Sequence, residues 1–200
     1  MGHSVLLVPV PVLESFVRDR WTHYEPGWVS ADPAFTHAHV TLLAPYLPRP
    51  EADDLATLAD IATTTPAFAY RLEAVTAFPN GVIHVPPVPA SPFAELTRRL
   101  VRAFPQCPPY DGAFGDLDDL VPHVTLDHHL GGVTTATVAA DVGDVLPVES
   151  VADRLELHWY DEGDCRALAS WPLGVSAAAP AGPAGAGSSA AAPAPPGVGR

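Results

Sequence analysis

The chain contains no lysine: its ten basic residues are all arginines, they stand against 23 acidic residues, and the formal net charge is −13. Proteins that hold long nucleic acids by their phosphates need many cations to displace counterions. The charge balance therefore argues against a protein that binds long duplex nucleic acid. Any phosphate that the chain handles must be met by arginine, histidine, hydroxyl or backbone N–H groups. A small ligand held at a local site is compatible with this composition.

Cysteine is scarce and long apolar runs are absent. The two cysteines, Cys107 and Cys165, could form one bridge but make no metal-ligand spacing, and we expect two free buried thiols, as is usual in a cytosolic protein. No apolar run approaches the roughly 20 residues that a membrane-spanning helix requires. The first residues also lack the cationic segment of a secretory signal. We expect a cytoplasmic protein without a membrane partner.

The length and the apolar content of the chain, 48 %, are enough for one domain with a sizeable core. Residues 176–200 differ from the rest, because they are almost entirely alanine, glycine, proline and serine and have nothing to bury against a core. We expect a folded domain over residues 1–175 and a disordered tail over residues 176–200. Deleting the tail should leave activity and melting temperature unchanged.

Hydrophobic periodicity in the folded part predicts a mixture of helices and strands. The predicted strands cover residues 4–10, 39–43, 68–78, 82–85, 123–126, 154–159 and 166–171, and the predicted helices cover 13–21, 53–64, 92–104 and 134–140. Asn80-Gly81 is a typical hairpin turn between two of these strands, and the last two strands form a second hairpin. Helices mixed with hairpins predict an α+β fold rather than a doubly wound parallel sheet.

One motif occurs twice in the chain: residues 39–42 and residues 123–126 both read His-Val-Thr-Leu. The composition makes a chance repeat of this tetrad very improbable. Side chains alternate between the two faces of a strand, so the histidine and the threonine of each copy point to one face while the valine and the leucine point into the core. Two such strands side by side would bring two imidazoles and two hydroxyls around one cavity.

These four side chains fit the chemistry of a phosphodiester. One of His39 and His123 can take a proton from an attacking water or ribose hydroxyl, while the other gives a proton to the leaving oxygen. The hydroxyls of Thr41 and Thr125 can donate to non-bridging phosphate oxygens and stabilise the charge that develops there. This mechanism needs no metal and no other cofactor. The residues themselves leave open which histidine is the acid and which is the base.

Four further side chains are candidates for the wall of the same groove: His37, Tyr46, His84 and Asp127. His37 lies on the same predicted strand face as His39 and extends the groove there. Two histidines alone do not make a catalytic zinc site, which needs three protein ligands, so we expect no metal. For His84, a partly buried structural role is an equal alternative.

The end of the second motif strand carries three more polar residues. If this strand continues, Asp127 and His129 share the face of His123, and either could orient its imidazole. His128 would then point away from the groove. A solvent-facing strand end is the alternative for all three.

The paired motifs and several segments around them resemble the 2′-5′ RNA ligase family of the two-histidine phosphoesterase superfamily. The segments that carry the resemblance are residues 8–11, 38–43, 92–93, 103–105, 109–114, 122–126 and 171–174. The resemblance covers about residues 4–175 and implies a bilobal fold, with two pseudo-symmetric α+β halves and mainly antiparallel sheets around a central groove. It also implies that His39 and His123 are the catalytic pair and that Thr41 and Thr125 bind the phosphate.

The activity that the resemblance implies is a metal-independent phosphodiesterase acting on 2′,3′-cyclic phosphates or on 2′-5′ linkages of nucleotides or short RNA. Ligation of RNA is the same chemistry in reverse. We expect the partner to be a nucleotide or an RNA end, bound by a monomer. Two alternatives stay open: a non-catalytic module that binds a nucleotide or RNA end in the same groove, and a hydrolase of a non-nucleotide phosphodiester. Turnover of a cyclic nucleotide would separate them.

Overall fold

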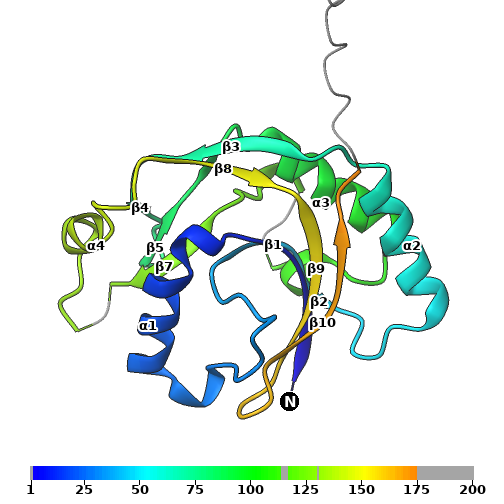
Figure 1. The fold of residues 1–200 in the computed structure, drawn as a ribbon, viewed down its shortest axis with the longest axis horizontal. Helices are drawn as coiled ribbons and strands as arrows, with labels where there is room; N and C mark the ends of the chain where they lie inside the picture. Colours follow the sequence, from blue (N-terminus) through cyan, green and yellow to red (C-terminus); the bar gives the residue numbers. More distant parts are fainter. Residues whose placement is uncertain (1, 114–116, 130, 175–200) are drawn as a thin grey trace, which may run out of the picture.

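The computed structural model describes residues 2–113, 117–129 and 131–174 (Figure 1). Residues 176–200, which the composition predicts to be disordered, lie outside this part, so the tail and the domain boundary at residue 175 stay predictions. The described residues form helices and antiparallel sheets, and the α+β class predicted from the sequence is confirmed.

The larger of two sheets has seven strands in the order β10-β9-β1-β2-β7-β5-β4, and neighbouring strands are antiparallel. Its strands are β1 (His3–Pro9), β2 (His39–Tyr46), β4 (Thr76–Ala77), β5 (Val82–Val85), β7 (Val124–His128), β9 (Arg154–Tyr160) and β10 (Arg166–Pro172). A smaller antiparallel sheet has the order β6-β3-β8, with β3 (Phe68–Leu72), β6 (Pro87–Val88) and β8 (Val148–Ala152). Figure 1 shows that the large sheet is strongly curved.

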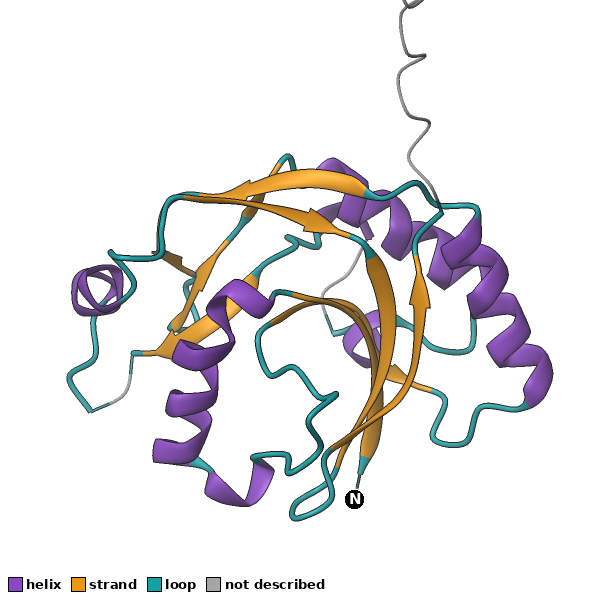
Figure 2. Cartoon of the chain, viewed as in Figure 1, coloured by secondary structure: helices purple, strands orange, loops and turns teal. Residues whose placement is uncertain are grey.

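The described part contains four α-helices, which Figure 2 shows around the two sheets. They are α1 (Glu14–Tyr24), α2 (Ala52–Thr63), α3 (Ser91–Ala103) and α4 (Thr135–Asp141). Helix α3 carries Pro92 in its first turn, where no N–H is needed, and buries Phe93, Leu96 and Leu100 at helical spacing. Helix α1 lies on the concave side of the large sheet (Figure 1). None of the described helices is long and apolar enough to cross a membrane.

Strand β1 is the clearest case of a strand covered on both faces. It lies between β9 and β2, and its residues from 4 to 9 are all buried. Leu6 and Val8 face the main core, whereas Val5 and Leu7 face the concave side and pack in a second cluster with Phe35. The segment between α1 and β2 therefore covers the concave face of β1 and β9.

The four helices predicted from the sequence are confirmed within three residues at each end, and so is the hairpin of β9 and β10. The prediction of one strand over residues 68–78 is wrong. This segment splits into two strands: β3, which belongs to the small sheet, and β4, which pairs with β5 in the large sheet. Strand β8 was not predicted, because this edge strand pairs only with β3 and lacks a run of buried residues.

Strand β2 carries the first His-Val-Thr-Leu motif, and β7 carries the second from Val124 onward, with His123 directly before it. The two strands are neighbours in the middle of the large sheet. Val40 lies opposite Val124, so equivalent positions of the two motifs face each other. Because the strands are antiparallel, the histidine of each motif lies toward the threonine of the other. The repeat in the sequence is thus a local twofold relation at the centre of the fold, as the expected pseudo-symmetric architecture requires.

Candidate active site

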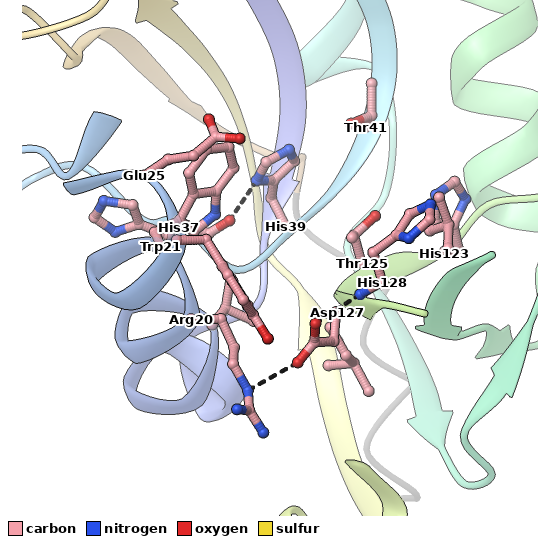
Figure 3. Close-up of a pocket in the computed structure, with 14 residues that line it drawn as sticks. Arg20, Trp21, Glu25, His37, His39, Thr41, His123, Thr125, Asp127 and His128 are labelled. Atoms are coloured by element: carbon pink, nitrogen blue, oxygen red, sulfur yellow. Dashed lines mark hydrogen bonds and ion pairs between the residues drawn. The ribbon is translucent and has the colours of Figure 1, made fainter. Parts of the chain in front are cut away.

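Both motifs open into one groove on the concave side of the large sheet (Figure 3). One part of the groove is a cavity of about 550 Å³, which we call the arginine lobe. It is lined by the histidine and the threonine of each motif and by Arg20 of α1. A second part of about 740 Å³, which we call the aromatic lobe, shares Trp21, Glu25, His39 and Thr41 with the first. The side chains of the first motif therefore stand where the two lobes meet.

The two motif histidines are held in the same way. Nδ1 of His39 lies 2.7 Å from the carbonyl oxygen of His37, and Nδ1 of His123 lies 2.8 Å from the carbonyl oxygen of Val121. A carbonyl oxygen can only accept a hydrogen bond, so each Nδ1 carries a proton and donates it. In the neutral imidazole the lone pair is then on Nε2. Each motif thus presents a histidine whose Nε2 can exchange a proton.

Burial disfavours the charged form of both histidines. The pKa of His39 is lowered from 6.5 to about 4, first by burial and then by charge on His158, and the hydrogen bond to the His37 carbonyl opposes this only in part. The pKa of His123 is also lowered by burial, against the opposing bond to the Val121 carbonyl. His39 shows the larger depression. At neutral pH the unliganded site therefore holds two largely neutral imidazoles.

His39 is packed against strand β9. The Tyr160 hydroxyl lies 3.5 Å from Nδ1 of His39, a long contact. Two residues earlier on the same strand, His158 is completely buried, with Nε2 at 2.8 Å from Glu156. The His158 ring stacks on Phe35, with 4.4 Å between the centroids. A buried acid and histidine pair thus lies beneath the first motif.

His123 has aromatic neighbours instead. Its ring makes edge contacts with Phe78 and His84, at centroid distances of 4.9 and 5.2 Å, and these two rings stack on each other at 3.7 Å. His84 is 3 % exposed and lines neither lobe, so its proposed place in the groove wall is wrong. It lies behind His123 because the bulge between β5 and β7 sets its register. The structural alternative for His84 is the one observed.

His37 lines the arginine lobe but is buried and fully engaged. Its Nδ1 lies 2.7 Å from Glu14, and its Nε2 accepts a hydrogen bond from the backbone N–H of Ser30 at 3.1 Å. Burial raises the pKa of Glu14, but the hydrogen bonds from His37 and from the Ala38 N–H outweigh it and lower that pKa overall. His37 therefore fixes the carbonyl that orients His39 and has no ring nitrogen left for a metal.

The polar residues at the end of β7 are arranged differently from the prediction. Asp127 lines the arginine lobe, but its carboxylate pairs with Arg20 at 3.0 Å (Figure 3) and does not orient His123, whose Nδ1 already donates to a carbonyl. His128 also lines this lobe, so its expected orientation away from the groove is wrong. The register of β5 with β7 contains a bulge at Leu126, which shifts the alternation of faces by one residue.

Tyr46 is a further correction, because its ring lies in the main core and lines neither lobe. It is 3 % exposed and contacts Phe104 edge-on, with 5.0 Å between the ring centroids. The pairing of β2 with β1 contains two register shifts. Ala44 and Pro45 lie within the shift between Leu43 and Tyr46 and both line the aromatic lobe, so that Tyr46 falls on the core side.

The motifs do not include Tyr110, which belongs to the same site. This residue lines the aromatic lobe and forms a hydrogen bond with the Thr41 side chain, while burial raises the pKa of its phenol. Tyr110 and Asp111 have left-handed backbone conformations with φ of 51° and 55°. Such a conformation is uncommon for residues other than glycine and is concentrated at functional sites.

Arg20, Tyr110 and Tyr160 are three of the groove residues that the sequence did not reveal. They come from α1, from the short helical turn Pro109–Gly112 and from β9, all distant in sequence from the motif beside which they lie. The only signal for Tyr110 is its place in a segment that carries the family resemblance. No local pattern distinguishes Arg20 or Tyr160 from other surface or strand residues.

The fold is shared with several solved structures. The protein TT0787 of Thermus thermophilus superposes with a TM-score of 0.54 at 18 % identity, over 86 % of this chain and 98 % of that one. A structure described as a phosphoesterase gives 0.50 at 17 % over 86 % and 98 %, and E. coli LigT in its apo form gives 0.50 at 18 % over 87 % and 99 %. At these identities the likeness shows the fold alone. The chain has the fold of these proteins, one of which is described as a phosphoesterase.

Residues 9–164 match the model of the 2′-5′ RNA ligase superfamily. The chain therefore belongs to the 2′-5′ RNA ligase superfamily, and the resemblance inferred from the sequence is confirmed. None of the curated proteins compared with the chain matches it. Membership in this family supports an activity of the phosphodiesterase or ligase type.

Proposed function

We propose that the protein is a metal-independent phosphodiesterase that acts on 2′,3′-cyclic phosphates or 2′-5′ linkages of nucleotides or short RNA, with ligation as the reverse reaction. The observation that carries this proposal is the pair of histidines in one groove, each with Nδ1 bonded to the carbonyl two residues before it. This arrangement supplies two Nε2 atoms for one reaction. The partner is a nucleotide or an RNA end, not a long duplex, and the working unit is a cytoplasmic monomer.

In this proposal His39 is the general base and His123 the general acid. His39, whose pKa is lowered to about 4, is neutral and ready to accept a proton from the attacking hydroxyl or water. His123 must carry a proton on Nε2 and give it to the oxygen that leaves phosphorus. Bound phosphodiester brings a negative charge that favours the protonated form of a neighbouring histidine. The substrate itself therefore helps to charge the acid.

Thr41 and Thr125 are the proposed phosphate-binding side chains. Both line the same lobe as the histidines, one from each central strand. Hydroxyl donors can hold the non-bridging oxygens and stabilise charge that develops there. Tyr110 is hydrogen-bonded with Thr41 and so acts as a positioning residue for that hydroxyl. A site built on neutral donors suits a chain without lysine.

The direct test is hydrolysis of 2′,3′-cyclic mononucleotides, with and without EDTA, by the wild type, His39→Ala and His123→Ala. His129→Ala is the matched control, since this exposed histidine stands at the end of β7 and lines neither lobe. We expect EDTA-resistant turnover by the wild type and the control and its loss in both motif variants. Binding of nucleotide or 2′-5′ linked RNA without turnover of either would instead identify a non-catalytic binding module.

A further inference from the structure

Apart from His39, no residue that lines the aromatic lobe takes part in the proton transfers described above. The lobe shares His39 and Thr41 with the arginine lobe, so a phosphate bound there has one open side toward each lobe. A volume of about 740 Å³ is within the range of small-molecule sites. One of the two substituents of a phosphodiester can therefore occupy this lobe.

Four aromatic side chains from separate segments line the aromatic lobe: Trp21, Trp28, Tyr110 and Tyr160. Two of them are held by defined contacts. Tyr160 stacks on His3 at 5.7 Å and meets the edge of Phe35 at 5.1 Å, and Tyr110 is hydrogen-bonded with Thr41. The ring faces of tryptophan and tyrosine carry negative potential and attract cations, most of all methylated ammonium groups.

Besides the two histidines His3 and His39, the ionisable side chains of this lobe that are charged at neutral pH have one sign. Glu25 and Asp111 line it, and its described lining contains no arginine in a chain without lysine. The arginine lobe differs, because Arg20 stands there between the carboxylates of Asp127 and Asp141 at 3.0 and 2.7 Å. A second phosphate would be repelled in the aromatic lobe, and a positive charge would be attracted.

We propose that the aromatic lobe binds a methylated cationic group of the substrate, attached to the phosphodiester at His39 and Thr41. The group is either an N-methylated base with a positive ring, such as 7-methylguanine, or a quaternary ammonium. The proposal rests on the proposed function for the position of the phosphate. It narrows the substrate to phosphodiesters with one cationic substituent, and it orients them with that substituent away from Arg20.

Calorimetric binding tests the inference without need for turnover. Phosphocholine is compared with 3,3-dimethylbutyl phosphate, which has the same shape with carbon in place of the charged nitrogen. 7-Methylguanosine monophosphate is compared with guanosine monophosphate. In at least one pair, we expect the ligand with the methylated cationic group to bind about tenfold more tightly than the ligand without it. The pair that shows the difference identifies the source of the cation. Equal affinities within both pairs would overturn the inference.

Two substitutions localise the effect. Glu25→Gln removes a carboxylate from the lobe, and Trp28→Leu removes a ring. Both should reduce the preference for the cation to threefold or less. Glu149→Gln is the matched control, because this carboxylate is 85 % exposed on β8, outside both lobes, and its loss changes the net charge equally. A preference that survives Glu25→Gln and Trp28→Leu in folded protein would place the cation elsewhere and contradict the proposal.

Turnover of 2′,3′-cyclic mononucleotides is measured on the same samples, so that the two proposals fail separately. Cation preference together with turnover supports both. Turnover with equal affinities overturns the cation site and leaves the phosphodiesterase. Cation preference without turnover of the cyclic nucleotide, of 2′-5′ linked RNA or of a cationic phosphodiester supports the binding lobe and removes the proposed catalysis.

Discussion

The two copies of the His-Val-Thr-Leu motif are alike in sequence and in backbone, and they differ in what surrounds them. Each histidine donates Nδ1–H to a carbonyl two residues before it, and the copies meet at Val40 and Val124. His39, however, packs against Tyr160 and the buried pair on β9, whereas His123 packs against aromatic rings. The repeat supplies two equivalent groups, and we propose that their different neighbours make one of them the base and the other the acid.

The largest expected effect comes from breaking both copies. His39→Ala and His123→Ala should each lower kcat/KM by about 10²- to 10⁴-fold, the usual contribution of general acid or base catalysis. The double variant should be no more than about tenfold worse than either single one, because groups that act in one reaction step are not additive. Steady-state kinetics on folded variants, checked by circular dichroism, decides this. Multiplied losses in the double variant would mean that the two histidines act independently.

The two threonines test whether both copies hold the phosphate. Thr41→Val and Thr125→Val should each lower kcat by about 10²-fold, since each removes a donor to the charged phosphate oxygens. Tyr110→Phe should cost only a few-fold in kcat, because it loosens Thr41 without removing its hydroxyl. This hierarchy is supported if kcat decreases from the wild type to Tyr110→Phe and decreases further in Thr41→Val. A Tyr110→Phe loss as large as that of Thr41→Val would assign Tyr110 a direct role.

The β9 pair provides a test of how the neighbours divide the roles. Charge on His158 lowers the pKa of His39, so its removal in His158→Gln should raise that pKa toward the ordinary 6.5. The acid limb of the pH profile then moves upward, and activity at pH 5 falls by several-fold relative to pH 7. His129→Gln, on an exposed residue, should leave the limb in place. If the acid limb does not move in folded His158→Gln, His158 does not set the pKa of His39 during catalysis, and this part of the proposal is wrong.

The smallest effect is expected at Tyr46. Its hydroxyl is buried and has no hydrogen-bond partner among the residues that the structure describes, so Tyr46→Phe removes an unsatisfied polar atom and keeps the ring. Stability to urea should be unchanged or higher by up to about 1 kcal/mol, and kcat/KM should stay within twofold of the wild type. A large loss of activity at unchanged stability would instead indicate that Tyr46 contributes to the active-site groove.

Sequence reasoning reached the features that depend on local periodicity. The motif strands, the helices and the shared face of His39 and Thr41 follow from spacing alone. The orientations predicted for Tyr46 and His128 were wrong because bulges in β2 and β7 shift the alternation of faces. These bulges arise from pairing with strands that are distant in sequence. Tyr160 could not be found, since it reaches the site from β9 through the order of strands in the sheet.

The most direct test of the division between base and acid is the pH dependence of kcat/KM for a 2′,3′-cyclic mononucleotide. His39 must be neutral, and its pKa of about 4 places the acid limb near pH 4. His123 must be protonated, and its lowered pKa places the alkaline limb below 6.5. The account predicts a bell with an acidic maximum and a tenfold fall per pH unit above it. A plateau that extends from pH 5 to pH 9 would contradict it.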